Sequence, residues 1–460
     1  MMSRGIVAVG AYAPENRVPA EAFEEAWGSF DAPGVETKAV PDGDEDALTM
    51  GVQAARRALS AGDADGDAID RLAFATTNPP LAEEDQTPRL GSYLGVPDSA
   101  SRRTHTGSTR AGIDALFGAL DSDDTALVVV SDCPEGEPDD SREHAAGAGA
   151  VAFVVGDDAP ATVADRATES EVRPGTRFRG HGEGDVAGLD TGTYGRAAFR
   201  EPIEAAVDAL SVEADTDAVA VQAPNGKLPY RTSLDNEAIA AVETVSELGD
   251  TAAASVPLSL ATAFTEGYDR TLAVGWGSGA GATAFVVEGV APVETELEGG
   301  RELDYPAYLR RRGDIVGEKP DGGAAHVSVP TWQRSVAQRH RHEAGRCPEC
   351  GAVAFPPGGA CPDCRSLVEF EPVVPELTGT VDAATTIGQG GAPPEFAEQQ
   401  AQQGAFGAAI VRFAAGDGEV SLPMQATESV DVGDTVRAVP RRVYVEEGVP
   451  RYGLKALPQD

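Results

Sequence analysis

Lysine is almost missing from this 460-residue chain, and cysteine and long apolar runs are also scarce. The only lysines are Lys38, Lys227, Lys319 and Lys455, and there are five cysteines. No apolar run approaches the roughly 20 residues of a membrane span. The N-terminal MMSRGIVAVGAYAP passes directly into a strand pattern without a signal-peptide core. The sequence therefore predicts a soluble cytoplasmic protein.

Positive charge is scarce as well, because 36 Lys and Arg stand against 75 Asp and Glu, which gives a net charge of −39. The acidic residues are spread along the chain, as on the surface of a halophilic protein. In molar salt the Debye length is about 3 Å, so repulsion between surface carboxylates is screened. The alternative, an acidic disordered protein, would have few aliphatic residues and no periodicity. Hydrophobic residues make up 41% of this chain, so we expect a folded protein.

Two segments of the chain repeat each other. Gly147–Gly156 (GAGAVAFVVG) and Gly279–Glu288 (GAGATAFVVE) differ only at their fifth and last positions, and each follows an apolar run. Helical patterns precede them, at Ser108–Leu120 and Ala252–Phe264. A helix, strand, strand unit at this long period predicts a duplicated α/β half rather than a solenoid. The halves are expected to stack as layers of helix and sheet, with one buried helix from each meeting near the centre.

Five stretches carry a family resemblance: EHAAGAGAVAFVVG, QAPNGKLP, LGDTAAASVPLSLA, GWGSGAGATAF and YPAYLRRRG. Together they resemble the thiolase superfamily, and within it the archaeal 3-hydroxy-3-methylglutaryl-CoA (HMG-CoA) synthases, over about Gly5 to Gly317. The resemblance implies an acyl-CoA condensing enzyme. In that family a cysteine at the start of the first buried helix is acylated, a glutamate deprotonates the second acyl-CoA, and a histidine helps to hold the acceptor carbonyl.

The three reactive positions that the resemblance implies carry other residues here. Thr106 holds the place of the cysteine, Gln222 that of the histidine, and Thr77, after the strand RLAFAT, that of the glutamate. A thiol suits the reaction because its pKa of about 8.5 falls at a helix N-terminus, whereas a threonine hydroxyl needs an adjacent base. The usual catalytic residues are therefore expected to be lost.

Other groups near these positions are candidates for a replacement nucleophile or base. His105 is the one local base for Thr106 or Ser108, and the alternative for THTGST is a polar turn with a helix cap. Cys133 follows the strand LVVVS and is expected to be a small buried or redox-inert thiol. Asp250 stands where relatives carry an asparagine that donates to an oxyanion, and a carboxylate there would oppose that charge.

A binding surface remains in the sequence. The PNGK turn projects Lys227, which we expect to contact a phosphate or the pantetheine of an acyl-CoA, an exposed turn being the alternative. The glycine-rich GWGSGAG is expected to place backbone N–H groups against a thioester oxygen. The predicted acyl-CoA contacts are Asn225, Gly226, Lys227, Gly277, Ser278 and Gly279.

Two C-x-x-C turns follow, Cys347-Pro-Glu-Cys350 and Cys361-Pro-Asp-Cys364. Four thiolates predict a tetrahedral Zn²⁺ site without an open position, which is structural rather than catalytic. The alternative is two disulfides, which a reducing cytoplasm disfavours.

Short strand-like segments with turn signals follow the cysteines and predict a small Greek-key barrel of the OB type. Ribbon and barrel, about Ser328 to Leu457, resemble the zinc-ribbon/OB-fold family that accompanies archaeal acetoacetyl-CoA thiolases and HMG-CoA synthases. The resemblance implies a protein that bridges two such enzymes and lines a passage for a CoA-linked intermediate.

The predicted fold class is α/β, with duplicated thiolase-fold layers of helix and sheet followed by a zinc ribbon and a small OB-type β-barrel. The predicted domains are 1–158 and 159–317 for the two thiolase-like halves, 318–330 for a linker, 331–370 for a helix with the zinc ribbon, and 371–460 for the barrel.

Three function hypotheses follow. The first is a non-catalytic acyl-CoA-binding scaffold or channelling partner, itself a homodimer, for a thiolase or synthase in mevalonate-type metabolism. The second is an active condensing enzyme, of the HMG-CoA synthase or ketoacyl synthase type, with a non-standard nucleophile. The third is a nucleic-acid module, which the net charge of −39 disfavours because phosphate neutralisation supplies most of such affinity. The one basic cluster in the sequence that could contact nucleic acid consists of Arg334, Arg339, His340, Arg341, His342 and Arg346.

Overall fold

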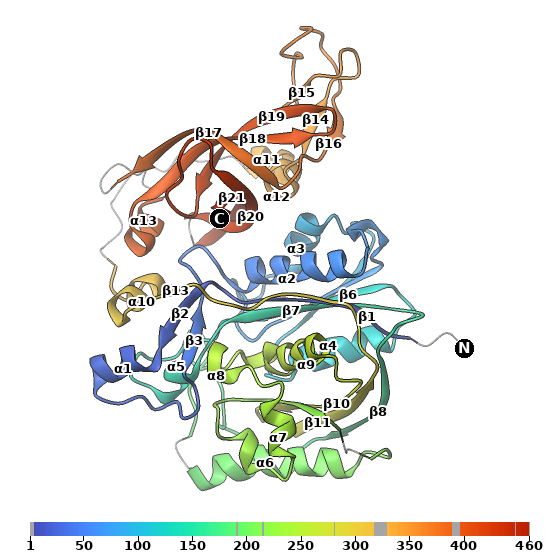
Figure 1. The fold of residues 1–460 in the computed structure, drawn as a ribbon, viewed down its shortest axis with the longest axis vertical. Helices are drawn as coiled ribbons and strands as arrows, with labels where there is room; N and C mark the ends of the chain where they lie inside the picture. Colours follow the sequence, from blue (N-terminus) through green and yellow to red (C-terminus); the bar gives the residue numbers. More distant parts are fainter. Residues whose placement is uncertain are drawn as a thin grey trace. The chain divides into compact units, whose positions relative to one another are not determined.

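The computed structural model describes residues 4–189, 192–213, 216–279, 281–316, 329–388, 396–446 and 448–459. The chain divides into two compact units (Figure 1). The first unit comprises Met1–Asp42 and Asp46–Tyr308, and the second comprises Gly43–Glu45 and Leu309–Asp460. None of the described helices is long and apolar enough to cross a membrane.

Two sheets form the centre of the first unit. The first sheet has the order β12 (Val293–Glu296), β1 (Gly5–Tyr12), β7 (Gly149–Gly156), β6 (Ala126–Asp132), β4 (Arg71–Ala75) and β5 (Ser101–His105). The second has the order β8 (Thr162–Glu169), β11 (Gly281–Glu288), β10 (Arg270–Gly277) and β9 (Ala218–Val221).

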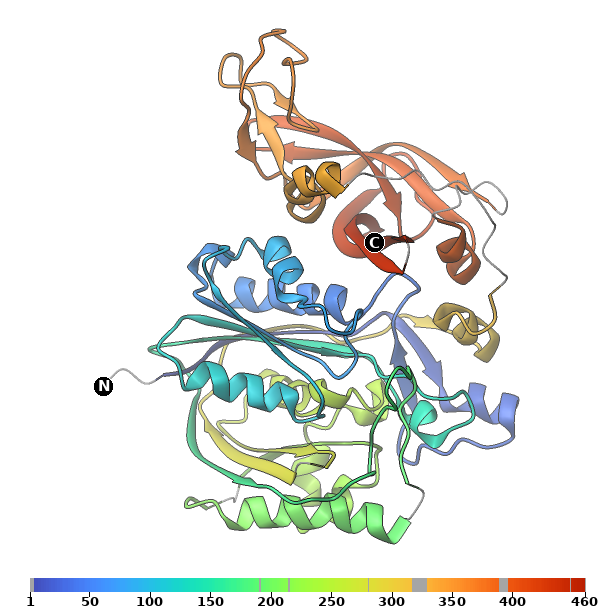
Figure 2. The same ribbon diagram turned by 180° about the vertical axis from the view of Figure 1, so that it is seen from behind.

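Helices alternate with these two sheets in five layers, as Figures 1 and 2 show. Helix α2 (Ala47–Ala61) covers the outer face of the first sheet, and α6 (Gly192–Asp208) covers the outer face of the second. Helices α4 (Ala111–Leu120) and α9 (Ser255–Glu266) lie between the sheets and share one buried apolar core with both. Strands β6 and β7 are buried at every position, as expected for a sheet covered on both faces.

The predicted duplication is confirmed by this arrangement. The two repeated segments become β7 and β11, each paired antiparallel with the preceding apolar strand, β6 or β10. The two central helices approach each other at Gly112, where a Cβ would lie 2.6 Å from the Ala253 carbonyl oxygen. Only glycine allows that approach, so the two halves meet at the starts of α4 and α9.

Shorter elements complete the first unit. A small sheet has the order β13 (Arg301–Glu302), β2 (Asn16–Pro19) and β3 (Thr37–Val40). The remaining α-helices are α1 (Ala20–Trp27), α3 (Thr87–Leu94), α5 (Ser141–Ala145), α7 (Asn236–Ala240), α8 (Val245–Leu248) and α10 (Tyr305–Arg312), which ends beyond the unit boundary, and the 3₁₀ turns are η1 (Gly66–Ala68), η2 (Pro229–Arg231) and η3 (Ala252–Ala254).

The second unit contains a closed five-stranded barrel, which confirms the predicted small barrel. Its strands follow the order β17 (Thr378–Ile387), β18 (Phe406–Ala415), β19 (Gly418–Ala426), β21 (Val449–Pro458) and β20 (Thr435–Glu446). A three-stranded sheet of β15 (Val353–Ala354), β14 (Ala344–Arg346) and β16 (Glu371–Val373) and the helices α11 (Val329–Arg334), α12 (Val336–Arg341) and α13 (Ala397–Gln403) complete it. Most of the predicted linker, 318–330, lies outside the described residues.

Candidate functional site

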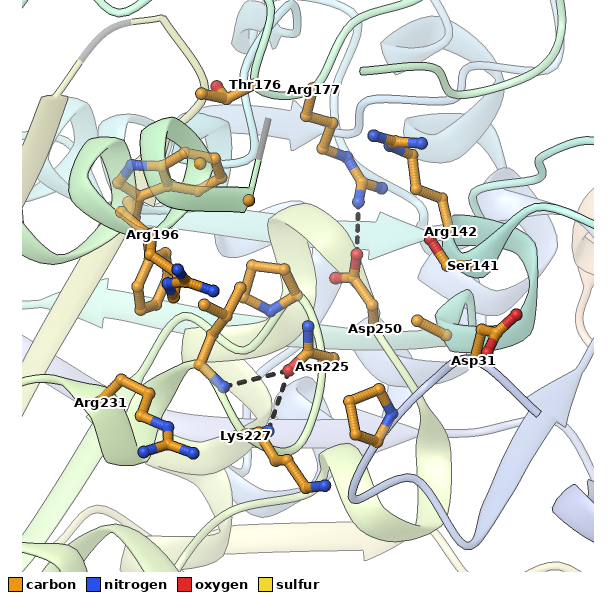
Figure 3. A pocket seen from close by; sticks show the side chains of 18 of the residues that line it. Asp31, Ser141, Arg142, Thr176, Arg177, Arg196, Asn225, Lys227, Arg231 and Asp250 are labelled. Carbon is orange, nitrogen blue, oxygen red and sulfur yellow. Dashed lines mark hydrogen bonds and ion pairs between the residues drawn. The ribbon is translucent and has the colours of Figure 1, made fainter. Parts of the chain in front are cut away.

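A pocket of about 430 Å³ lies in the first unit, near the start of α6 (Figure 3). Its walls come from α5, from the turn after β9, from the end of β10 and from the segment between β8 and α6. The described lining residues are Asp31, Pro33, Ser141, Arg142, Ala145, Thr176, Arg177, Leu189, Gly192, Gly195, Arg196, Phe199, Pro224, Asn225, Lys227, Leu228, Arg231, Asp250 and Trp276.

Positive charge gathers in this pocket although the whole chain is strongly acidic. Its described lining residues contain five cations and only two carboxylates. Arg142 pairs with Asp140, and Arg177 pairs with Asp250. The remaining three cations, Arg196, Lys227 and Arg231, have no acidic partner among the described residues. Three uncompensated cations at one cavity can bind a multiply charged anion such as a pyrophosphate.

The few lysines of the chain occupy contrasting places. Lys38 and Lys455 are buried, and each lies 2.7 Å from a carboxylate oxygen, of Glu143 and of Asp44 respectively. Lys227 is the one described lysine that is exposed, and it lines the pocket. Lys319 lies outside the described residues.

The turn at Asn225 and Gly226 fixes the position of Lys227. The side-chain oxygen of Asn225 accepts hydrogen bonds from the backbone N–H groups of Lys227 and Leu228, at 2.9 and 3.0 Å (Figure 3). A Cβ on Gly226 would lie 2.2 Å from the carbonyl oxygen of Gly34, so the two loops pack backbone to backbone. The Asn225 oxygen therefore holds the turn, and the ammonium group of Lys227 is left for a ligand.

The other end of the pocket is formed by a buried ion pair. Arg177 donates to Asp250 (Figure 3). The second oxygen of Asp250 accepts the backbone N–H of Ala252 at 2.9 Å. The hydroxyl of Ser278 accepts the backbone N–H of Arg177 at 2.9 Å and lies 3.0 Å from Thr176 Oγ1. The glycine-rich turn thus anchors the segment that carries Arg177. Trp276 lines the pocket, whereas Gly277, Ser278 and Gly279 do not.

Two of the three predicted reactive positions meet at the 3₁₀ turn before α9. Thr77 donates its N–H and its hydroxyl to the buried carboxylate of Asp132, at 2.9 and 3.0 Å. The same carboxylate accepts the N–H of Ala253 at 3.1 Å, and Gln222 Nε2 donates to the Ala252 carbonyl at 2.8 Å. Burial raises the pKa of Asp132 although these hydrogen bonds oppose the shift.

Thr106 lies elsewhere. It is exposed in the loop between β5 and α4, and its neighbour His105 packs beside Gly118, where a Cβ would lie 3.9 Å from His105 Cε1. The buried hydroxyl just before α4 belongs to Thr109, and it donates to the carbonyl oxygen of Trp276 at 2.6 Å. Sequence reasoning missed Thr109 because a polar turn carries no periodicity that fixes its register.

No thiol or imidazole belongs to the described residues that line the pocket. Cys133 follows β6, and its pKa is raised well above its usual value by burial and by the nearby carboxylates of Glu135 and Asp132. This environment therefore disfavours the reactive thiolate form of Cys133 at neutral pH. Thr77, Thr109 and Gln222 are also absent from the described pocket wall.

The four remaining cysteines come together in the second unit. One sulfur atom from each of Cys347, Cys350, Cys361 and Cys364 lies within 4.8 Å of all the others. Cys347 and Cys364 are 3.8 Å apart, and Cys350 and Cys361 are 3.6 Å apart, so no disulfide is formed. The donor set fits one tetrahedral zinc ion with no position left for a substrate.

Three arginines of the basic cluster make contacts within the second unit. The Arg339 guanidinium lies 4.2 Å from the centre of the Trp332 ring. Arg341 pairs with Glu343, and Arg346 donates to the Ala415 carbonyl. Because these contacts engage the cations internally, they do not favour nucleic-acid binding.

Comparisons with known proteins identify relatives of both parts of the chain. The chain is 30% identical to the hydroxymethylglutaryl-CoA synthase of Thermococcus gammatolerans, over 68% of this chain and 97% of the relative. It is 31% identical to the hydroxymethylglutaryl-CoA synthase of Pyrobaculum calidifontis, over 68% and 98% respectively. Residues 334–371 match the family described as ChsH2, rubredoxin-like zinc ribbon domain.

Solved structures show the same fold. A structure of HMG-CoA synthase complexed with CoA has a TM-score of 0.61 at 17% identity and covers 71% of this chain and 95% of its own. MvaS in complex with 3-hydroxy-3-methylglutaryl coenzyme A has a TM-score of 0.57 at 18% identity, over 71% and 95%. These likenesses confirm the predicted thiolase-like layers.

Proposed function

The chain belongs to the hydroxymethylglutaryl-CoA synthase family, and from that premise we propose that it binds acyl-CoA without catalysing a condensation. It acts as a scaffold or channelling partner for a thiolase or a synthase. The observation that carries the proposal is the pocket itself, which combines three uncompensated cations with an ion pair at its other end and holds no described thiol or imidazole.

The cationic side of the pocket suits the phosphates of CoA. Arg196, Lys227 and Arg231 supply charge-assisted hydrogen bonds, and the apolar faces of Phe199, Leu228 and Trp276 suit a pantetheine arm. Asn225 and Gly226 set the turn that presents Lys227, while Ser278 positions Arg177 through its backbone. Gly277 and Gly279 flank Ser278 and are proposed to shape that anchor.

The lack of a reactive centre supports a binding role. We assign Thr109, rather than Thr106, to the place of the acylated cysteine, because it holds the buried hydroxyl at the start of α4. Thr77 and Gln222 are hydrogen-bonded to Asp132 and to Ala252, and within the described residues the Thr109 hydroxyl is hydrogen-bonded to a backbone carbonyl rather than to a base. Arg177 neutralises Asp250, so the site presents an ion pair where an oxyanion would need free donors.

The alternative is an active condensing enzyme with a non-standard nucleophile. Thr109 is the hydroxyl that this alternative would use, because it lies at the N-terminal end of a buried helix, where the helix dipole stabilises an anion. Its hydroxyl is already donated to a carbonyl, and His105 packs elsewhere on α4. A covalent acyl adduct would decide for this alternative.

Calorimetric titration with CoA and acetyl-CoA in molar KCl tests the binding proposal. The wild-type chain is expected to bind both. Changing Arg196, Lys227 or Arg231 singly to Gln is expected to weaken binding up to about tenfold, the worth of one charge-assisted contact. Arg412→Gln is the matched control, because Arg412 pairs with Asp382 and Glu419 on the barrel. Absent binding, or equal affinity in all variants, would contradict the proposal.

Gel filtration with a thiolase and a synthase from the same organism tests the scaffold role. Co-elution that strengthens with acetoacetyl-CoA is expected, because a channelling partner gains from the shared ligand. The elution volume of the chain alone tests the proposed homodimer. If all three proteins elute separately, with and without ligand, the scaffold role is contradicted, while the proposal of CoA binding is not.

A further inference from the structure

A three-residue segment from the N-terminal part of the chain belongs to the C-terminal unit. Gly43–Glu45 clusters with Leu309–Asp460, whereas Asp42 before it and Asp46 after it belong to the first unit. The chain therefore passes between the units three times, at 42/43, at 45/46 and at 308/309.

The segment supplies the counter-charges for two buried cations of the barrel. Lys455 Nζ lies 2.7 Å from Asp44 Oδ2, with side chains that are 0% and 1% exposed. Arg441 lies 3.4 Å from Asp44 Oδ1 and 3.1 Å from Glu45 Oε1, and these three side chains are also buried. Two buried carboxylates thus face two buried cations, and Arg442 adds a third positive charge beside Asp44.

The two cations lie on neighbouring strands. In the β20–β21 ladder Val439 faces Lys455 and Arg441 faces Gly453, so both cations project from the same face of the hairpin. Without Asp44 the ammonium group of Lys455, which is 0% exposed, would lose its carboxylate partner. Leaving a buried charge without its partner is among the costliest changes that a fold can suffer.

Backbone contacts hold the segment as well. The N–H of Arg442 donates to the Asp44 carbonyl at 2.9 Å, and its guanidinium donates to the Gly43 carbonyl. Gly43 packs on α13, where an added Cβ would lie 3.0 Å from Gln402 Oε1. Gln399 on the same helix lies 3.5 Å from Asp44 Oδ2 through its amide nitrogen.

Only a few residues of chain connect this segment to the elements of the first unit on either side. Strand β3 ends at Val40, and α2 begins at Ala47. Asp46 caps α2 by accepting the N–H of Thr49 at 3.0 Å, while Thr49 Oγ1 accepts the N–H of Asp46 at 2.9 Å. The segment is thus tied covalently, at both ends, to elements fixed in the first unit.

We propose that the C-terminal unit is completed in cis by the acidic segment Gly43–Glu45, and that this segment makes the two units fold and unfold as one cooperative system. The occupied surface is the face of β20 and β21 that carries Arg441 and Lys455. Its partner is a short acidic stretch of the same chain. The ribbon and barrel are therefore not an independent module joined by a linker.

Calorimetry and hydrogen exchange on the full-length chain test this proposal. The wild type is expected to unfold in one calorimetric transition, and peptides from β20–β21 and from α2 are expected to lose protection at the same denaturant concentration. In Asp44→Asn/Glu45→Gln the β20–β21 peptides are expected to exchange on the order of 100-fold faster, while β10–β11 peptides stay protected. The single transition is then expected to split in two.

Two further variants make the test decisive. Asp382→Asn, which removes an exposed barrel carboxylate paired with Arg412, is the control and is expected to leave exchange of β20–β21 unchanged. If Asp44→Asn/Glu45→Gln yields no folded protein, adding Lys455→Met is expected to recover barrel protection in part, because it removes the fully buried cation that Asp44 had paired. Two separate transitions in the wild type, equal exchange in variant and control, or no recovery with Lys455→Met would overturn the proposal.

Discussion

The hydroxyl of Thr109 donates a 2.6 Å hydrogen bond to the carbonyl oxygen of Trp276, and this contact joins the two halves of the first unit at their centre. Thr109 precedes α4, and Trp276 lies on β10. A hydroxyl that gives its proton to a backbone carbonyl is not activated as a nucleophile, because activation requires an acceptor that can keep the proton.

This contact predicts that the chain forms no acyl-enzyme. After incubation with acetyl-CoA, intact mass spectrometry is expected to show only the unmodified protein, since Thr109 lacks a base and Cys133 stays protonated. Iodoacetamide under the same conditions checks that any accessible thiol would be detected. A stable acetyl adduct that disappears in Thr109→Val, Ser108→Ala or Cys133→Ser would establish an active condensing enzyme instead.

The close approach of Gly34 and Gly226 predicts a loss of CoA affinity when a methyl group separates them. In Gly226→Ala the new Cβ would start 2.2 Å from the Gly34 carbonyl oxygen, so the turn that carries Lys227 must shift. Calorimetric titration is expected to show CoA binding weakened by about tenfold, the worth of one ionic contact.

Gly195→Ala is the matched control for this loop. Gly195 also lines the pocket, but no atom beyond its chain neighbours and its own helix backbone lies within 4 Å of the added Cβ. Alanine also suits the interior of α6 better than glycine does. Equal CoA affinity in both variants would show that the packing of Gly226 on Gly34 does not position Lys227.

The buried carboxyl of Asp132 predicts a pH-dependent effect of Asp132→Asn. Because burial raises the pKa of Asp132 in the folded state, the stability that its protonated form provides is present below its ordinary value of about 3.9. That stability is lost as the pH rises through the folded pKa. Asparagine does not ionise. Its amide N–H can donate to the Thr77 hydroxyl, which then accepts a hydrogen bond instead of donating one.

The melting temperature of Asp132→Asn, relative to wild type, is therefore expected to rise as the pH increases above about 4. Thermal melts from pH 4 upward in molar KCl measure the difference. Asp121→Asn is the control, because Asp121 forms an exposed pair with Arg166. A difference that is constant with pH, or that falls, would show that the Asp132 carboxylate stabilises the fold in its charged form.

Much of the fold could be predicted from local patterns in the sequence. The repeated strands β7 and β11 and the two C-x-x-C turns are short, regular signals, so the layers and the cysteine cluster could be predicted. Arg177 could not, because it comes from an irregular segment, and Arg196 could not, because α6 brings it to the site only through long-range packing. The pairing of Asp44 with Lys455 spans 411 residues and has no local signature at all.

The cysteine cluster gives a prediction about the ribbon. Cys361 is buried, and its N–H donates to the Ser366 carbonyl at 2.8 Å. This hydrogen bond closes the turn that contains the second C-x-x-C pair. Elemental analysis of the purified chain is expected to find one zinc ion per molecule. In Cys361→Ser the zinc content is expected to fall close to zero, because three thiolates and a hydroxyl bind zinc far more weakly than four thiolates.

Loss of the zinc is expected to weaken the barrel as well as the ribbon. Ala344, in the ribbon sheet, belongs to the same buried apolar cluster as Val411 and Phe413 of the barrel, and Val353 packs against that cluster. Hydrogen exchange in β14 and β18 should therefore accelerate together in Cys361→Ser, whereas Cys133→Ser should leave both the zinc content and the exchange unchanged. Zinc-free wild-type protein that resists alkylation until it is reduced would point to disulfides in place of the metal.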